Sequence, residues 1–394
     1  MRKARARLGS RLGVVAALAL LAATGACGEE ALDVVPTGGR LVIVGGGLDA
    51  ETAPVWEAVV EGRDGDGPLC VLPTASGVPE RSMASARDAL NRYGGEGTAV
   101  GVMITEGDTA MAADPEVVAR LEACAGYWFV GGQQSRVTAT LAPGGEATPA
   151  LEAIRRRHQD GAVVAGTSAG AAIMSPWMIA GGSSEEALEV GFREEPEGDG
   201  VVLTDGLGFF PTGVVDQHFL ARGRIGRLLV TVLERPEIAV GFGIDENTAL
   251  VVDGGEARVA GESGVVVVDG RGDDPERAVL SLAGPGDRID LRTLEVTFDP
   301  AKVPLPVEDA SFAEVDILER WAFLNALLTF STRMDVGMVA DFNGRLLTLE
   351  KGDGFRAVMD APGGAEGTDT ERTGPQGTPA GFGAGPFKAE LAPR

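Results

Sequence analysis

The stretch from Ala162 to Met174 reads AVVAGTSAGAAIM. Its first four residues are apolar and predict a buried strand, and the residues after Gly170 predict the start of a helix. Between them lies a Gly-x-Ser-x-Gly sequence, which in this context is typical of a nucleophile elbow, a tight turn that exposes its serine. The stretch therefore predicts that Ser168 is a nucleophile. It also predicts that the Ala169 N–H, at the helix N-terminus, faces a developing oxyanion.

Other apolar runs predict the rest of the sheet. They lie at residues 41–44, 69–72, 99–104 and 127–130, with helical stretches at 80–93 and 115–124 between them. Continuous apolarity indicates strands that are covered on both faces. Strands alternating with helices predict an α/β fold, with a parallel sheet and helices on both of its faces. From Ile238 onward the chain is rich in short apolar strands, and Asp253-Gly254-Gly255 predicts a hairpin.

The chain contains only two histidines, so any reaction assisted by histidine has two candidates. His218 follows the apolar residues 213–215, which predicts that it lies at a strand end, at the sheet edge where Ser168 also lies. A serine nucleophile needs a neighbouring base, and we assign this role to His218. His158 follows three arginines on a charged helical stretch, and we expect it to be solvated on the surface.

A histidine base needs a carboxylate to orient its ring. Asp245 and Glu246 follow the apolar residues 238–242, which predict another strand. Adjacent side chains at the end of a strand point in opposite directions, so only one of the two acids faces the site. The pattern does not choose between them.

Two glycine-rich turns follow predicted strands. The first begins at Gly131 and Gly132, and paired glycines let backbone N–H groups approach a ligand closely. We therefore expect the second oxyanion donor in the region of Gly132 and Gln133. The second, at residues 45–47, lacks the Gly-x-Gly-x-x-Gly spacing of a dinucleotide site, and we assign no nucleotide to it.

Arg222, Arg224 and Arg227 lie within nine residues of His218. Guanidinium groups bind carboxylates in a bidentate manner. In a chain with a net charge of −24, a positive cluster beside the expected base indicates a substrate with anionic groups. The alternative is a helix face whose arginines pair with acids of the same chain.

The composition excludes several classes of protein. With 34 Lys+Arg against 58 Asp+Glu, the chain lacks the positive balance that nucleic-acid binding requires. Two histidines and the absence of a Cys-x-x-Cys pair argue against a structural zinc site or another metal cluster. Of the three cysteines, Cys70 and Cys124 lie in the expected globular part. We expect these two to be buried thiols, with a single disulfide as the alternative.

The N-terminus has the features of an export signal. A basic start at residues 2–11 precedes an apolar stretch at 12–23, which is shorter than a membrane-spanning helix. Small residues then lead directly to Cys27, as in lipoprotein signals, where the cysteine becomes acylated. We expect a signal peptide at 1–26, a linker at 27–38, and an exported protein that is anchored to the membrane through Cys27 or extracellular. Ordinary signal cleavage with an incidental cysteine is the alternative.

We expect the catalytic domain at 39–290 and a C-terminal extension at 291–351, with an amphipathic helix within 312–330. Residues 352–394 are rich in Gly and Pro and sparse in apolar residues before Phe382. Such a composition predicts a largely disordered tail.

Taken together, the chain resembles the cyanophycinase family of serine peptidases, whose relatives include aspartyl dipeptidase (dipeptidase E). The matching segments occur in the family's order at residues 44–47, 129–134, 166–171, 216–227 and 243–250. The resemblance implies a flavodoxin-like α/β fold, similar to class I glutamine amidotransferases. It also implies a triad of Ser168, His218 and Glu246, which favours Glu246 over Asp245. The substrate pocket that it implies consists of Gln134, Asp216, Gln217, Arg222, Arg224 and Arg227.

Members of this family hydrolyse cyanophycin, a poly-aspartate chain with arginines on its β-carboxyls, to β-Asp-Arg dipeptides. This chain has Gln133 where the family commonly has Asp, which bears on the charge of the pocket and on the substrate. The hypothesis from sequence is an exported serine exopeptidase that acts on cyanophycin and needs no metal or organic cofactor; the resemblance also suggests a homodimer. The alternatives are an aspartyl dipeptidase or isopeptidase for short peptides, and a non-catalytic surface binding protein on the same scaffold.

Overall fold

The structure is a computed structural model that describes residues 34–193, 198–305, 318–332, 337–342, 345–361 and 379–391. The expected signal peptide, the lipidation site Cys27 and the first part of the linker lie outside these residues. So do the first part of the expected helix at 312–330 and residues 362–378 of the expected tail. Within the described ranges, no helix combines the length and the apolar character needed to cross a membrane.

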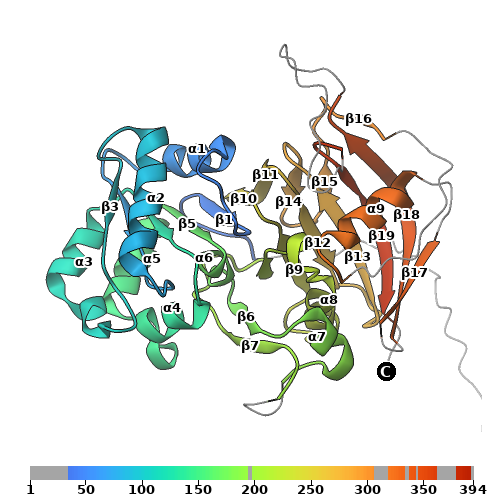
Figure 1. The fold of residues 1–394 in the computed structure, drawn as a ribbon, viewed down its shortest axis with the longest axis horizontal. Coiled ribbons are helices and arrows are strands. Elements are labelled where there is room, and N and C mark those ends of the chain that lie inside the picture. The colour runs from blue at the N-terminus through green and yellow to red at the C-terminus, as the bar shows by residue number, and fades with distance from the viewer. Residues whose placement is uncertain are drawn as a thin grey trace, which may run out of the picture.

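The described residues form two β-sheets (Figure 1). In the first, β1, β5, β4, β2 and β3 are parallel neighbours, and antiparallel strands β10, β11, β14 and β15 continue the sheet beyond β1. The bounds are β1 Leu41–Val44, β2 Leu69–Leu72, β3 Ala99–Gly101, β4 Gly126–Phe129, β5 Val163–Thr167, β10 Thr248–Asp253, β11 Glu256–Gly261, β14 Arg288–Asp290 and β15 Val296–Thr297. The predicted hairpin is confirmed, because Asp253 pairs with Glu256 across Gly254-Gly255.

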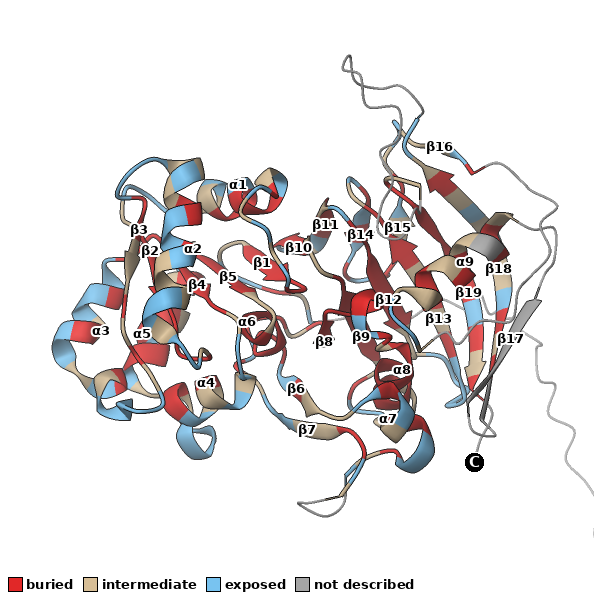
Figure 2. Cartoon of the chain, viewed as in Figure 1, coloured by how far each residue is buried: buried red, intermediate tan, exposed pale blue. Residues whose placement is uncertain are grey.

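Helices cover both faces of the parallel strands. Their bounds are α1 Ala53–Glu61, α2 Pro79–Gly94, α3 Pro115–Glu122, α4 Gln134–Leu141 and α5 Pro149–Gln159, with 3-10 turns at Thr109–Ala113 and Pro143–Gly145. α1 and α2 share a core with Val42 and Val44, whereas α3, α4 and α5 share one with Leu41 and Ile43. Because successive strand residues point to opposite faces, a four-residue apolar run is buried on both sides, as Figure 2 shows. This confirms the predicted α/β class.

The second sheet has the strand order β16-β18-β19-β13-β12-β9-β8-β6-β7, and β17 pairs with β18. Its strands are β6 Trp177–Gly181, β7 Val202–Asp205, β8 Val214–Gln217, β9 Val240–Ile244, β12 Val265–Asp269, β13 Arg277–Ala283, β16 Val303–Pro304, β17 Gly337–Phe342, β18 Arg345–Met359 and β19 Gly383–Leu391. The remaining helices are α6 Ala169–Ala172, α7 Ser184–Val190, α8 Ile225–Glu234 and α9 Ala322–Thr332, with a 3-10 turn at Leu220–Arg222. The strands that precede His218 and Asp245 therefore belong to a different sheet from the strand of Ser168. The expectation of a shared sheet edge is wrong on this point.

The C-terminal region departs from the prediction. The expected disordered tail includes the end of β18 and all of β19, and β19 pairs with β13 and β18. Within β19 the apolar residues Phe387, Ala389 and Leu391 alternate and are buried. A composition averaged over the whole tail conceals this short alternating pattern. The strands after residue 290 also extend both sheets, so the extension is continuous with the core.

Cys70 and Cys124 form a disulfide, with their Cα atoms 5.9 Å apart. The expectation of buried thiols is wrong, and the alternative of one disulfide is confirmed. Both residues lie in the core between the first sheet and the helices α3 and α5. Their separation of 54 residues gives no local pattern from which the pairing could be inferred.

Candidate active site

Ser168 lies in the turn between β5 and α6, with φ 55° and ψ −111°. This left-handed backbone is costly for a residue other than glycine and needs support from its surroundings. The glycines on either side provide the room. A Cβ at Gly166 would overlap the carbonyl oxygen of Gly170, and a Cβ at Gly170 would overlap that of Phe129. The structure thus has the strand, tight turn and helix that the sequence predicted for this stretch.

His218 follows β8 and lies between the serine and an acid. Its Nε2 is 2.9 Å from Ser168 Oγ, and its Nδ1 is 2.6 Å from Glu246 Oε1. A carboxylate can only accept, so Nδ1 carries the proton and Nε2 is left to accept from the serine hydroxyl. Side chains from three separate parts of the chain are therefore joined in one hydrogen-bonded series.

Asp245 and Glu246 lie where the chain crosses from β9 in the second sheet to β10 in the first. Glu246 turns to His218 and keeps 25% of its side chain exposed. Asp245 is fully buried and accepts hydrogen bonds from the Ala221 N–H at 2.8 Å, Ser263 Oγ at 2.7 Å and Trp321 Nε1 at 3.1 Å. Burial raises the pKa of Asp245 in spite of these donors. Of the two adjacent acids, only Glu246 contacts the histidine.

The glycines at 45–47 lie beneath these side chains. The Gly45 carbonyl accepts from the His218 N–H at 2.6 Å, and the Gly46 carbonyl accepts from the Asn247 N–H at 3.0 Å. Gly46 has φ 106°, and a Cβ there would overlap the imidazole of His218. Sequence reasoning gave this run no function beyond its place in the family resemblance, because its role depends on a histidine far along the chain.

Alanine at Gly46 is expected to lower kcat/KM about a hundred-fold, because the new methyl group displaces the His218 ring from Ser168. Kinetics on folded protein measure this effect. Gly95→Ala is the matched control: Gly95 has φ 92°, and a Cβ there meets no atom within 4 Å. Similar losses in both variants would show that backbone strain, and not the contact with His218, is responsible.

The oxyanion donors expected from sequence are partly corrected. Gln133 donates its backbone N–H to the Ala75 carbonyl at 2.8 Å, so that group is already engaged. Gly131 lies against Ser168, since a Cβ there would be 3.3 Å from the serine Cβ. Among the described residues, the N–H groups of Ala169, Gly131 and Gly132 have no hydrogen-bond acceptor. Ala169 and Gly132 therefore remain candidates from the sequence, and the structure adds Gly131.

Two of the residues expected to bind substrate are buried against each other. Asp216 is 1% exposed, and its carboxylate accepts from Arg227 Nη2 at 2.5 Å and Nε at 2.7 Å. Arg224 donates to the Gln217 carbonyl at 2.5 Å and lies 3.4 Å from Asp216. Burial alone would raise the pKa of Asp216, but the two arginines hold it below its usual range. Asp216 and Arg227 thus use their polar atoms on each other and expose little surface, and their expected role in substrate binding stays a prediction.

The other expected substrate residues are placed differently. Arg222 is exposed, and no described residue forms an ion pair with it. Gln134 is partly buried and donates from Nε2 to the Ile179 carbonyl at 3.0 Å. Gln217 is buried, and its Oε1 has no hydrogen-bond donor among the described groups. Gln133 exposes its side chain in the loop that starts beside Ser168.

The expectation for His158 is wrong. This residue is buried at the end of α5, where Nδ1 lies 2.9 Å from the Ala162 carbonyl and the ring packs edge-on against Phe209. Burial lowers its pKa. The arginines before it suggested a solvated face, but a helix turns by about 100° per residue and places this side chain inward. His158 has a structural role and lies apart from Ser168.

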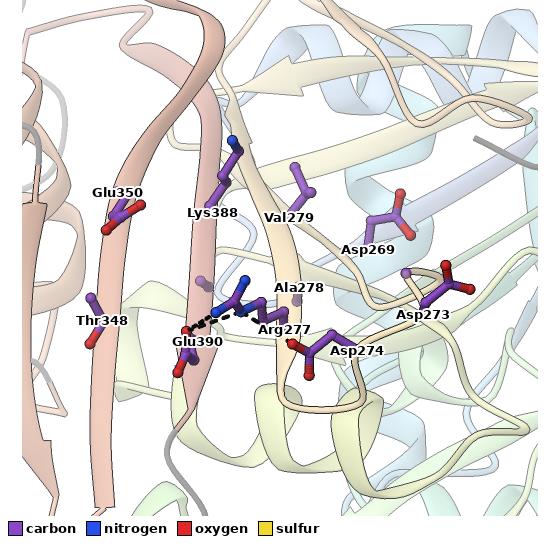
Figure 3. Close-up of a pocket in the computed structure, with 12 residues that line it drawn as sticks. Asp269, Asp273, Asp274, Arg277, Ala278, Val279, Thr348, Glu350, Lys388 and Glu390 are labelled. Atoms are coloured by element: carbon purple, nitrogen blue, oxygen red, sulfur yellow. Dashed lines mark hydrogen bonds and ion pairs between the residues drawn. The ribbon is translucent and has the colours of Figure 1, made fainter. Parts of the chain in front are cut away.

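A pocket shown in Figure 3 is separate from this site. It lies at the strand ends of the second sheet that are opposite to Asp245 and Glu246. It lies between the loop before β13 and the strands β18 and β19. It is lined by Asp269, Gly272, Asp273, Asp274, Arg277, Ala278, Val279, Thr348, Glu350, Lys388, Ala389 and Glu390. None of these is a serine, cysteine or histidine, so the pocket holds no counterpart of the Ser168 arrangement.

A mixed α/β fold with a serine elbow, a histidine and a glutamate in hydrogen-bond contact has the features of a serine hydrolase. The chain belongs to peptidase family S51, whose sequence model matches residues 50–260, more than half of its length. It is 42% identical over 156 residues to a cyanophycinase from Nostoc sp., covering 39% of this chain and 48% of that protein. It is 36% identical over 208 residues to a cyanophycinase from Synechococcus elongatus, covering 52% and 60%.

The chain thus spans about half the length of the curated relatives that it matches. Among solved structures, a peptidase from an acI-B1 Actinobacterium aligns with a TM-score of 0.48 and 23% identity. That alignment covers 64% of this chain and 97% of the other.

Proposed function

We propose that this protein is an exported serine peptidase that hydrolyses cyanophycin to β-Asp-Arg dipeptides. The observation that carries the proposal is the hydrogen-bonded series from Ser168 through His218 to Glu246 at a nucleophile elbow. Membership of peptidase family S51 and similarity to proteins named cyanophycinase support the substrate class.

The geometry supports a two-stage acyl transfer. Ser168 Oγ attacks the scissile carbonyl carbon while His218 Nε2 takes the hydroxyl proton. The carbonyl oxygen becomes an oxyanion, for which the N–H groups of Ala169 and of Gly131 or Gly132 are the donors. His218 then gives its proton to the leaving amine and the C–N bond breaks. Water enters by the same route, with His218 as base, and releases the acid and the free serine.

The experiment incubates the purified full-length protein and its Ser168→Ala variant with insoluble cyanophycin and identifies the products by mass spectrometry. The proposal expects β-Asp-Arg from the wild type alone. If the folded wild type released no β-Asp-Arg from cyanophycin but cleaved short β-aspartyl peptides, the protein would be an isopeptidase for short peptides and not a cyanophycinase. Gln133 would then be the first residue to examine. If a fluorophosphonate probe also failed to label Ser168, the protein would be a binding protein.

Export is a separate part of the proposal. The buried disulfide between Cys70 and Cys124 supports it, because disulfides persist mainly in oxidising compartments. The N-terminal signal pattern agrees with it. Fractionation of the producing cells, with labelled fatty acid and a Cys27→Ser variant, tests the anchor: label in the wild type alone supports acylation at Cys27, and protein confined to the cytoplasm would contradict export.

The acid limb of the pH profile of kcat/KM is expected below pH 6.5. Burial lowers the pKa of His218, the hydrogen bond to Glu246 opposes this, and the charge of Arg222 lowers it further. Because the base must be neutral to accept a proton, a lowered pKa keeps the enzyme active at more acidic pH. Arg222→Gln is expected to move this limb upward, measured at constant ionic strength. A wild-type limb above pH 6.5 would contradict the assignment.

A further inference from the structure

A segment from the C-terminal region lies on the loops that carry the candidate active site. The Trp321 N–H donates to the Leu220 carbonyl at 2.7 Å, and the indole Nε1 donates to Asp245 Oδ2 at 3.1 Å. The Leu318 carbonyl lies so close to Gly223 that a Cβ there would overlap it. The helix α9 that follows buries apolar side chains in the core of the second sheet. The segment from Leu318 to Trp321 is therefore held by its contacts with the active-site loops and by the helix that follows it.

Arg320 extends from this segment to the glutamate of the series. Its Nη2 lies 3.6 Å from Glu246 Oε2, while Glu246 Oε1 contacts His218. The Arg320 guanidinium also lies over the Trp321 ring, 3.9 Å from its centroid. The Arg320 side chain is 61% exposed, and solvent does not restrict its conformation. Stacking on the indole ring does restrict it. Each oxygen of the carboxylate thus faces a different partner.

Backbone strain marks the same region. In the part of the chain that the structure describes, five residues other than glycine have a positive φ: Ser168, His218, Asn247, Leu294 and Trp321. Ser168 and His218 belong to the series, Asn247 follows Glu246, and Trp321 follows Arg320. Strained residues persist where the surroundings hold them, and they cluster at functional sites. Trp321 therefore groups with the active-site loops, although it comes from the C-terminal region.

We propose that Arg320 is a positioning residue that holds Glu246 in the orientation in which one carboxylate oxygen accepts from His218. A carboxylate with a single partner can rotate and lose that contact, whereas a second partner on the other oxygen restricts the rotation. The proposal rests on the proposed function, because it concerns the same series of side chains. It makes the C-terminal extension part of the active site.

The test compares the wild type with Arg320→Gln and Arg320→Lys by proton NMR of the His218 Nδ1–H. The chain has two histidines, so His218→Gln assigns the signal. We expect Arg320→Gln to shift or broaden it and to slow the labelling of Ser168 by a fluorophosphonate roughly three- to ten-fold. Lysine keeps the charge and is expected to restore much of both. In a Glu246→Gln background the substitution is expected to have no further effect on labelling.

Arg277→Gln is the matched control. Arg277 is 62% exposed and lies 2.8 Å from Glu390. Figure 3 shows the pair, which lies at the strand ends of the second sheet that are opposite to Asp245 and Glu246. An unchanged Nδ1–H signal in Arg320→Gln, or an equal change in Arg277→Gln, would overturn the proposal. The NMR signal of the His218 Nδ1–H is measured without any substrate being hydrolysed. A protein that fails on cyanophycin but shows the expected change would therefore contradict the substrate and not the role of Arg320.

Discussion

Replacing Glu246 with glutamine is expected to lower kcat/KM about a thousand-fold or more, with little change in the free energy of unfolding. The glutamine amide can turn its NH₂ toward His218 Nδ1, which favours the tautomer with the proton on Nε2. That nitrogen can then no longer accept from Ser168 Oγ. Because Glu246 is 25% exposed, and because a glutamine of the same size still forms a hydrogen bond with His218, the fold loses little. Steady-state kinetics and urea unfolding measure the two effects.

The neighbouring acid is the matched control, with the opposite expected result. Asp245 is fully buried, and its Oδ2 accepts from both Ser263 and Trp321. Asparagine would place an NH₂ donor against the indole N–H and leave a buried donor unsatisfied. We expect Asp245→Asn to destabilise the protein by about 1–3 kcal/mol. The rate per folded molecule is expected to change far less than in Glu246→Gln. A large rate loss in Asp245→Asn with unchanged stability would reverse the assignment of the two acids.

Removing the Asp216 carboxylate is expected to lower the free energy of unfolding by about 3–5 kcal/mol. Asp216→Ala leaves Arg227, which is itself buried, without its bidentate partner. The loss of stability comes mainly from the unpaired charge of Arg227 that remains buried, and less from the net contribution of the ion pair to folding. Urea unfolding of the wild type and the variant measures the loss.

A double variant separates the effect of the unpaired buried charge from the contribution of the ion pair. Asp216→Leu combined with Arg227→Met removes both charges and keeps apolar volume, so much of the lost stability is expected to return. If Asp216→Ala instead left stability unchanged and raised KM, the carboxylate would face the substrate, as the sequence suggested. Stability loss without a matching KM effect supports the structural role.

Many of the strands, turns and helices of this protein can be predicted from short stretches of its sequence. The run from Ala162 to Met174 predicts strand, elbow and helix correctly, because its apolar residues and its glycines act on their immediate neighbours. The buried four-residue runs that became β1 and β2, and the hairpin between β10 and β11, are local in the same sense. Where local composition was averaged over a long segment, as in the tail that contains β19, the prediction was wrong.

The partners of charged and sulfur-containing side chains required the tertiary structure. Whether Asp245 or Glu246 meets His218 depends on how the chain crosses between two sheets. The burial of Asp216 against Arg227, and the pairing of Cys70 with Cys124, depend on which segments pack together. Strands and turns are determined by steric and burial preferences that act over a few residues. The partner of a side chain is determined by residues far away in the sequence, and only the assembled core brings them within reach.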